Sequence, residues 1–370
     1  MSGLALVLVS TAVVAATCLA CAALLLVAER YLASYGPCRI EINRGSKTLN
    51  VEGGKPLLAL LTSRQIFIPS ACGGRGTCAY CKVKILSGAP PIAPTELTLL
   101  TPQELADNVR ISCQVKVRND LAIEIPENLF LVKRFTAAVE RIRDLTHDIK
   151  ELRLRLLDPP EIQFTPGQYI QLEVPPYGDN PEPVYRAYSI SSTPSDRGHV
   201  ELIIRLVPGG ICTTWVFTRL KPGDTVAFNG PHGDFRLSDT PREMVWIAGG
   251  SGMAPFWGMA RHMLQHRIQR PCTYFFGAVA TRDLFFLDEF RQLEAQLPTF
   301  RFVPALSGNP HDDGWTGERG LITHVVDRHV AAGDDKEAYL CGSSGMIDAA
   351  VKVLKAKGIT EERIFYDKFT

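Results

Sequence analysis

The sequence has almost no excess of charge of either sign. Its 370 residues include 40 lysines and arginines and 39 aspartates and glutamates, which gives a net charge of +1. Proteins that bind nucleic acid usually carry a basic surface that neutralises phosphates. We therefore expect no nucleic-acid partner, and the length leaves room for two or three domains.

The start of the chain has no charged side chain at all. The run Ser2–Ala28 consists mainly of Leu, Val and Ala, and about 20 apolar residues suffice to cross a bilayer core. Glu29, Arg30 and Tyr31 follow it, as polar and aromatic residues do at a membrane interface. Because no Lys or Arg precedes the run, the positive-inside rule places the rest of the chain in the cytoplasm. We predict a single-pass anchor, residues 1–35, in the cell inner membrane.

There are two alternatives to an anchor. A cleaved signal peptide would have a basic segment before a shorter apolar stretch, and it would leave a periplasmic carrier. The mature N-terminus decides between these cases. A helix buried in a globular domain would usually show a polar face, and this run has none.

A disulfide framework is not expected, because such frameworks are typical of short secreted chains and this chain is long. Six of its ten cysteines stand apart in apolar surroundings, where cysteine behaves as a small hydrophobic residue. This usage indicates a reducing compartment. The other four cysteines have a spacing that suggests metal chemistry: Cys72, Cys78, Cys81 and Cys113.

Three of these four cysteines share the glycine-rich stretch Cys-Gly-Gly-Arg-Gly-Thr-Cys-Ala-Tyr-Cys, and Cys113 comes much later. Four thiolates are the ligand set of a [2Fe–2S] cluster, and the glycines allow the backbone to curl around its sulfides. Structural zinc is the alternative. Zinc sites usually pair two Cys-x-x-Cys hooks, which the sequence Ser-Cys-Gln around Cys113 does not supply. The spacing predicts a [2Fe–2S] cluster on these four cysteines.

Hydrophobic patterns divide the rest of the chain into three parts. Strand patterns around the cysteine-rich loop, with a short helix from Pro56, predict a small β-grasp domain over 36–130. Alternating strands with Pro and Gly turns predict an antiparallel β-barrel over 131–236. Apolar strands that alternate with helical stretches predict an α/β domain with a parallel sheet over 237–370. The expected fold class is therefore multidomain, with a transmembrane helix before these three domains.

A flavin site is indicated in the barrel. An arginine can hold a pyrophosphate, a tyrosine can stack on a flat ring, and a hydroxyl can approach a ring nitrogen. The following helix begins with glycine and small hydroxyl residues, and a helix N-terminus suits phosphate. Each pattern alone could be ordinary strand or cap sequence, but together they favour FAD. The predicted residues are Arg186, Ala187, Tyr188, Ser189, Gly210, Thr213 and Thr214.

A nicotinamide site is indicated in the α/β domain. Gly-Gly-Ser-Gly-Met-Ala-Pro follows an apolar strand and opens a helix, although it is not the G-x-G-x-x-G fingerprint and could be a structural turn. A second glycine turn follows Cys341, which is either a small core residue or a group at the site of hydride transfer. The predicted residues are Gly249, Gly250, Gly252, Met253, Pro255, Cys341 and Gly342.

The chain ends in Tyr-Asp-Lys-Phe-Thr, and a floppy tail is the default expectation for such an end. The alternative is that the ring of Phe369 covers the flavin until the nicotinamide displaces it.

Together, the cysteine motif, Arg-x-Tyr-Ser, the Gly-Gly-x-Gly-x-x-Pro turn and Cys-Gly resemble the ferredoxin–NADP⁺ reductase superfamily with a fused N-terminal ferredoxin. Within it, the whole chain is most similar to the F subunits of the sodium-translocating NADH:quinone oxidoreductases. The linker around Val132, Lys133 and Arg134 is also similar. The sequence departs from that family at Ser343 and Ser344, where Cys-Gly-Pro-Pro is usual, and in a shorter loop around Pro175–Pro183.

The resemblance implies a role for each motif. The four cysteines would ligate the cluster, and Gly250, Gly252 and Cys341 would border the nicotinamide. FAD would be held by Arg186, Tyr188 and Ser189, with Thr213 at its phosphates. Phe369 would stack on the isoalloxazine, and Ser189, Cys341 and Phe369 would act at the catalytic centre. The implied cofactors are FAD, the [2Fe–2S] cluster and NADH.

The expected function is that of a membrane-anchored reductase that passes electrons from NADH through FAD and [2Fe–2S] to other subunits of a membrane complex. Two alternatives stay open. The chain could be the reductase component of an oxygenase, although such reductases generally have no anchor. It could also be a tethered electron carrier without NADH turnover, for which Ser343 and Ser344 are the one argument.

Overall fold

The computed structural model describes residues 3–32, 35–308, 314–333 and 335–369. Ser2, in the predicted anchor, and Thr370, in the predicted tail, lie outside these ranges. The described chain forms two compact units. The first runs up to Ile68 and resumes over Ala79–Leu129, and the second comprises Pro69–Cys78 and the residues from Phe130 onward.

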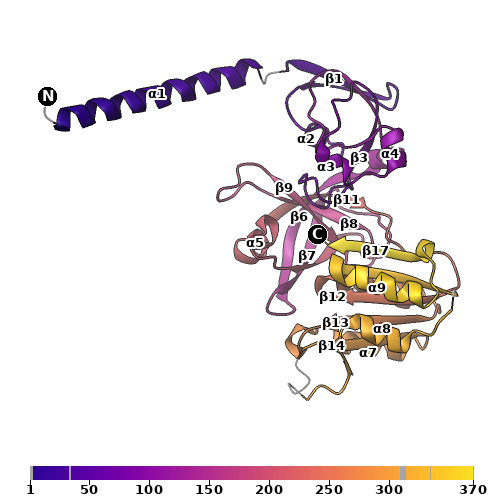
Figure 1. Cartoon of the computed structure of the whole chain (residues 1–370). Helices are drawn as coiled ribbons and strands as arrows, with labels where there is room; N and C mark the ends of the chain where they lie inside the picture. The colour runs from indigo at the N-terminus through magenta and orange to yellow at the C-terminus, as the bar shows by residue number, and fades with distance from the viewer. Residues whose placement is uncertain (1–2, 33–34, 309–313, 334, 370) are drawn as a thin grey trace. The chain divides into compact units, whose positions relative to one another are not determined.

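The chain begins with the long helix α1 (Gly3–Leu32), drawn in indigo in Figure 1. Apolar side chains on its middle turns, such as Val13, Leu19 and Leu24, are 60–71% exposed. In the part of the chain that the structure describes, no helix is both long and apolar enough to cross a membrane.

The rest of the first unit is built on a five-stranded mixed sheet in the order β2-β1-β5-β3-β4, in which only β1 and β5 run parallel. The strands are β1 (Pro37–Ile42), β2 (Lys47–Glu52), β3 (Lys82–Ser87), β4 (Val109–Ile111) and β5 (Leu121–Glu124). The helices are α2 (Leu57–Ser63), α3 (Pro94–Leu97) and α4 (Pro102–Ala106), and the 3₁₀ turn η1 (Glu127–Leu131) connects the chain to the second unit.

Alternation of side chains explains the core of this sheet. Ile40 and Ile42 of β1 are fully buried, as are Leu57 and Leu61 of α2, so the helix lies on the apolar face of the sheet. Pro56 precedes α2 as its N-cap residue rather than occupying the first helical position. The strands expected on either side of the cysteine loop are therefore confirmed.

The barrel of the second unit is a six-stranded antiparallel sheet in the order β10-β7-β6-β11-β8-β9. A bridge between Ile190 and Leu202 brings the two outer strands together. The elements are β6 (Lys133–Asp144), β7 (Ile149–Asp158), β8 (Tyr169–Val174), β9 (Val184–Ser189), β10 (His199–Arg205), α5 (Ile211–Thr218) and β11 (Thr225–His232). The predicted antiparallel barrel is confirmed.

The C-terminal part of the second unit is a parallel sheet in the order β15-β14-β13-β12-β16-β17. Its strands are β12 (Glu243–Gly249), β13 (Cys272–Ala278), β14 (Phe300–Leu306), β15 (Glu318–Arg319), β16 (Lys336–Ser343) and β17 (Ile364–Phe369). Its helices are α6 (Met253–Gln265), α7 (Leu287–Gln296), α8 (Ile322–His329) and α9 (Ser344–Ala356), with 3₁₀ turns η2 (Gly250–Gly252), η3 (Thr281–Asp283) and η4 (Glu361–Arg363).

Both faces of this sheet are buried, which is why its strands read as continuous apolar runs. Trp246 of β12 packs with Phe256 of α6 and Phe290 of α7 in one core. The next residue, Ile247, points to the other face and packs in a second core with Ile347 of α9. Helices α6 and α7 thus pack on one face of the sheet and α8 and α9 on the other, and the predicted parallel α/β fold is confirmed.

The C-terminal tail is a strand, so the default expectation of a floppy end is wrong for the described residues. Ile364–Phe369 form β17, which pairs in parallel with β16 and places Phe369 opposite Ser343. The edge of β16 offers unpaired backbone groups, and the tail satisfies them with a regular hydrogen-bonded ladder.

Candidate active site

The predicted flavin strand is β9, which pairs along its length with β8. Arg186 is partly buried and donates from Nη1 to the carbonyl of Tyr185 at 2.7 Å. Burial, and then the positive charge of Arg75, lower the pKa of Arg186. A guanidinium held in this way offers the rest of its donors to an anion, which fits the predicted contact with a flavin pyrophosphate.

Cys212 lies beneath this strand and was not foreseen as a site residue. It sits in the first turn of α5, is buried, and interacts with the hydroxyl of Tyr188. Burial raises the pKa of Cys212 to about 11, so the thiol is neutral, and burial together with Cys212 raises the pKa of Tyr188. The thiol therefore helps to fix the ring that we expect to stack on the flavin.

At the start of α5, one of the hydroxyls predicted to bind phosphate is already hydrogen-bonded within the protein. Gly210 is the N-cap residue. Thr213 Oγ1 accepts from the amide of Val207 at 3.1 Å, which makes this hydroxyl part of the turn before the helix. Thr214 is only partly buried, so its side chain is the more open of the two.

The predicted catalytic residues Ser189 and Cys341 have a common neighbour, Asp367 of β17. Ser189 is 4% exposed, and its Oγ completes no hydrogen bond of normal geometry. Burial raises the pKa of Asp367 to about 6, and its interaction with Ser189 partly opposes that rise. Burial, and then Asp367, raise the pKa of Cys341. The buried hydroxyl of Ser189 can therefore form a further hydrogen bond, and a polar ring atom of a cofactor would be a suitable partner.

Phe369 and Asp367 project from the same face of β17, because side chains two residues apart in a strand do so. Asp367 lies opposite Cys341 in the register, and Phe369 lies opposite Ser343. The Oγ of Ser344 donates to the carbonyl of Phe369 at 3.4 Å. Asp367 could have been found from the sequence only if the tail had been predicted as a strand.

The two glycine turns of the predicted nicotinamide site meet at the carboxyl ends of neighbouring strands, β12 and β16. Gly249 ends β12, and Gly250 has a positive φ of 57°. A Cβ on Gly252 would lie 2.2 Å from the carbonyl oxygen of Cys341, so only glycine fits there. Gly342 follows Cys341, and the N-terminus of α6 opens beside both turns, where phosphates bind well.

The other members of this predicted site have less specific positions. Met253 and Pro255 are buried in the first turn of α6 and contribute to the core. Ser343 accepts from the amide of Met346 at 3.4 Å and so caps α9. With Ser343 and Ser344 in place of the usual two prolines, α9 therefore still begins with a regular N-cap.

Arg205 adds a cation that the sequence patterns did not reveal. Its Nη1 lies 3.2 Å from the position that a Cβ on Gly250 would take. Its Nε donates to Asp148 at 2.7 Å, which orients the guanidinium. The residue comes from β10, well before the glycine turn in the sequence, so only the fold brings the two together.

The cysteine loop of the second unit curls back so that two of the predicted cluster ligands lie close together. Cys72 and Cys78 bring their sulfur atoms within 3.4 Å, and this hydrogen bond is the main cause that lowers the pKa of Cys72 to about 3. Gly73, Gly74 and Gly76 all have a positive φ. A loop curled in this way fits a group bound by thiolates.

Cys81 and Cys113, in the first unit, form a second pair. Both are buried, and the Cys113 thiol, followed by burial, raises the pKa of Cys81. Gln114 donates to the sulfur of Cys113 at 3.5 Å. Among the described residues, no three His, Cys, Asp or Glu side chains form a group that could hold a metal ion. The structure thus shows the four predicted ligands as two sulfur pairs, one in each unit.

Three protein families match successive parts of the chain. Residues 40–118 match the 2Fe-2S iron-sulfur cluster binding domain, and residues 136–237 match the oxidoreductase FAD-binding domain. Residues 246–352 match the oxidoreductase NAD-binding domain. These matches support FAD, the [2Fe–2S] cluster and NADH as cofactors, in the order in which the sequence predicts their domains.

Similar proteins span nearly the whole chain. The F subunit of the Na(+)-translocating NADH-quinone reductase of Neisseria meningitidis is 36% identical over 94% of this chain and 95% of that protein. The protein of the same name in Methylococcus capsulatus is 36% identical over 92% of this chain and 94% of that protein.

Solved structures are similar over nine tenths of the chain. The Amycolatopsis cytochrome P450 reductase GcoB has a TM-score of 0.73 at 31% identity, covering 90% of this chain and 99% of that one. A ferredoxin reductase of carbazole 1,9a-dioxygenase has a TM-score of 0.68 at 27% identity, covering 90% and 98%. From this similarity and the three domains, the chain belongs to the family of Na(+)-translocating NADH-quinone reductase F subunits and is an NADH-dependent flavo-iron-sulfur oxidoreductase.

Proposed function

We propose that this chain is the NADH-oxidising subunit of a membrane-bound electron-transfer complex, with electrons passing from NADH through FAD and [2Fe–2S] to a partner in the membrane. The observation that carries the proposal is the convergence of Ser189, Cys341 and Asp367 beside two glycine turns at the carboxyl ends of β12 and β16. The proposed domains are 1–35 as anchor, 36–130 as ferredoxin, 131–236 as FAD-binding barrel and 237–370 as NADH-binding domain.

In this proposal the protein orients the reactants and supplies no acid or base for the hydride step. When bound, FAD accepts a hydride and the cluster accepts single electrons. Arg186, Tyr188 and Thr214 hold the flavin, while Gly250, Gly252 and the start of α6 receive the dinucleotide phosphates. Ser189 offers its buried hydroxyl to the flavin ring. Phe369 shields that ring, and Cys72, Cys78, Cys81 and Cys113 ligate the cluster.

Residues 1–35 anchor the protein to the cell inner membrane in a single pass, with the other domains in the cytoplasm. The support is the uncharged run Ser2–Ala28, together with exposed apolar side chains on the middle turns of α1, such as Val13 and Leu25. The partners are then the lipid bilayer, NADH and further subunits. By analogy with the named relatives, quinone is the proposed final acceptor, and sodium transport is the proposed coupled process.

A second candidate has one observation in its favour. Two similar solved structures are reductases named for a cytochrome P450 and for carbazole 1,9a-dioxygenase. The chain could therefore deliver electrons to an oxygenase. The uncharged N-terminal run argues against a freely diffusing partner of this kind.

A comparison of the full chain with a variant that lacks residues 2–30 tests the membrane proposal. The full chain should sediment with membranes and support NADH-driven quinone reduction there, whereas the shortened chain should keep ferricyanide reduction but lose quinone reduction. Full quinone reduction by the shortened chain would contradict the need for an anchor. Efficient reduction of an oxygenase with no reduction of quinone would favour the second candidate.

A further inference from the structure

One face of helix α6 lies directly on the barrel loop that follows the flavin strand. Gly258, Arg261 and Gln265 share this face, because residues three and four apart align along a helix. A Cβ on Gly258 would lie 3.0 Å from the carbonyl oxygen of Ser192, and Gln265 accepts from the hydroxyl of Ser195 at 2.9 Å. We call these three residues and the loop 190–195 the α6 seam.

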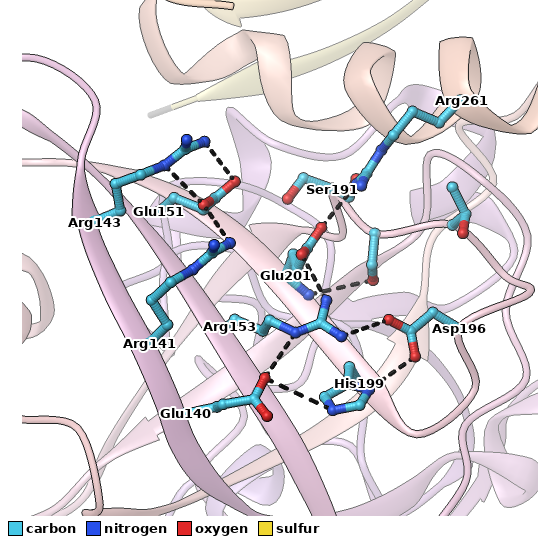
Figure 2. Close-up of polar contacts among 12 residues, drawn as sticks. Glu140, Arg141, Arg143, Glu151, Arg153, Ser191, Asp196, His199, Glu201 and Arg261 are labelled. Carbon is cyan, nitrogen blue, oxygen red and sulfur yellow. Dashed lines mark hydrogen bonds and ion pairs between the residues drawn. The ribbon is translucent and has the colours of Figure 1, made fainter. Parts of the chain in front are cut away.

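Arg261 is the charged centre of the seam. Its Nη2 donates to the carbonyl of Ser191, two residues after Ser189, and to Glu201 of β10 at 2.8 Å. The ring of Trp257 lies 4.8 Å from its guanidinium carbon. Figure 2 shows Arg261 reaching from its helix to Ser191 and Glu201. The side chain is therefore fixed at several points.

Glu201 is a strong acceptor for this bond. It is 5% exposed and is also held by Arg153 Nη1 at 2.7 Å. Burial would raise its pKa, but Arg261 and Arg153 together lower it, so the carboxylate stays charged. Arg153 in turn is bound by Glu140 and Asp196, at 2.7 and 2.9 Å. The seam is thus tied to a network that spans three strands of the barrel, β6, β7 and β10 (Figure 2).

The position of α6 matters because the helix begins at the glycine turn of the nicotinamide site. The seam lies along the same rigid helix, and its other side is the loop that continues the flavin strand from Ser189. A shift of the seam would move the two candidate binding sites relative to each other. Misplacement by about 1 Å can cost roughly 100-fold in rate when two reactants must be aligned.

We propose that Arg261 is a positioning residue for hydride transfer. Its bonds to Ser191 and Glu201 join α6 to the barrel and so fix the position of the nicotinamide site relative to the flavin site. The inference rests on the hydride transfer proposed above. Arg261 is not among the residues proposed to bind FAD or NADH, and its side chain contacts Ser191, Glu201 and Trp257. Its loss should therefore change the alignment of the two sites and leave the proposed binding groups in place.

The test is the full-length variant Arg261→Met, which keeps much of the side-chain bulk but loses both bonds. Glu201 retains Arg153, so no buried carboxylate is left unpaired. We expect flavin reduction by NADH in stopped flow to slow at least tenfold, with an FAD content equal to that of the wild type. The kinetic isotope effect with 4-deuterated NADH should increase, because alignment then limits the chemical step. Arg261→Lys should recover part of the rate.

Arg141→Met is the matched control. Arg141 pairs with buried Glu151 at 3.0 Å, and Glu151 keeps Arg143 at 3.2 Å, but this pair lies within the barrel and does not touch α6 (Figure 2). The control should lower thermal stability by as much as Arg261→Met while leaving the hydride-transfer rate and the isotope effect unchanged.

Amide hydrogen exchange gives a readout that does not need turnover. Exchange of residues 190–195 should be faster in Arg261→Met than in the wild type or in Arg141→Met, with or without NADH. Gly258→Ala places a methyl group 3.0 Å from the carbonyl oxygen of Ser192 and so pushes α6 away from the loop. It should slow hydride transfer as Arg261→Met does.

Equal rates of flavin reduction in Arg261→Met and Arg141→Met would overturn the proposal, as would a rate loss that only follows lost FAD or lost stability. If NADH fails to reduce the flavin of the wild type, the proposed hydride transfer itself is wrong. In that case the exchange data would still show whether Arg261 holds the seam.

Discussion

At the residue scale, the candidate site combines side chains that the sequence predicts with side chains that only the fold brings near. Arg186, Tyr188 and Ser189 are adjacent in one strand, so a local pattern predicted them together. Asp367 and Arg205 come from β17 and β10. Their part in the site depends on sheet order and register, which no local motif contains.

The raised pKa of Asp367 gives a pH prediction. Because its pKa in the folded protein is about 6, above the ordinary value of 3.8, the neutral carboxyl is stabilising below about pH 4, and this contribution is lost as the pH rises through 6. The charged form then costs up to about 3 kcal/mol. Asp367→Asn lacks this cost, so its melting temperature should exceed that of the wild type more at pH 7.5 than at pH 4.5.

The control for this comparison is Tyr366→Phe, a change in the same strand that removes no carboxyl, at a residue that is 45% exposed. Its difference in melting temperature from the wild type should change little between the two pH values. A constant difference for Asp367→Asn would show that this carboxyl does not titrate as described.

The cluster ligands give a second prediction at this scale. Cys72→Ser should abolish the cluster, because a hydroxyl is a poor substitute for a thiolate toward iron. We expect iron content and visible absorption of the cluster to be lost while FAD remains. Cys38→Ala, a change at a cysteine that is also buried but lies outside the motif, should lose some stability and keep its iron. Retention of iron in Cys72→Ser would contradict the assignment.

At the element scale, the kind of sheet in each domain followed from its strand and helix patterns, but the last strand did not. The tail 364–369 pairs with β16 because that edge offers hydrogen bonds, and this partnership is invisible in a six-residue window. The meeting of the two turns at Gly252 and Cys341 was also invisible in a local stretch of sequence. Each turn was predicted separately, and the parallel order of β12 and β16 brings them together.

Gly252→Ala tests that meeting of turns. The added methyl would lie 2.2 Å from the carbonyl oxygen of Cys341, so the helix start must move. We expect NADH affinity to fall at least tenfold in equilibrium titrations, with a loss of stability of about 1–3 kcal/mol. Gly345→Ala is the control, because nothing lies within 4 Å of its added methyl. Equal NADH affinity in the two variants would argue against the predicted site.

The terminal strand gives a prediction about Phe369, which is 36% exposed at the strand end. Phe369→Ala should change the flavin absorption and fluorescence, because it removes the ring proposed to cover the isoalloxazine, while the melting temperature stays nearly constant. Tyr366→Ala removes an aromatic ring that is 45% exposed from the same strand and should leave the flavin spectrum unchanged. Identical spectra for both variants would remove Phe369 from the proposed site.

At the scale of the whole molecule, the order of the modules was predictable because each has its own sequence signature. The cysteine loop, the barrel turns and the alternation of strands and helices occur in the order of the three matched domain families. The α6 seam could not be predicted, since it joins residues of the barrel and the parallel sheet through Ser191, Glu201 and Arg261.

The central claim is that electrons from NADH reach the cluster through the flavin within this one chain. Stepwise addition of NADH to the purified full-length protein under anaerobic conditions, followed by absorption and EPR spectroscopy, tests it most directly. We predict that the flavin band bleaches and that the signal of a reduced [2Fe–2S] cluster then appears. A flavin that bleaches without any cluster signal, or a flavin that NADH does not reduce, would contradict the account.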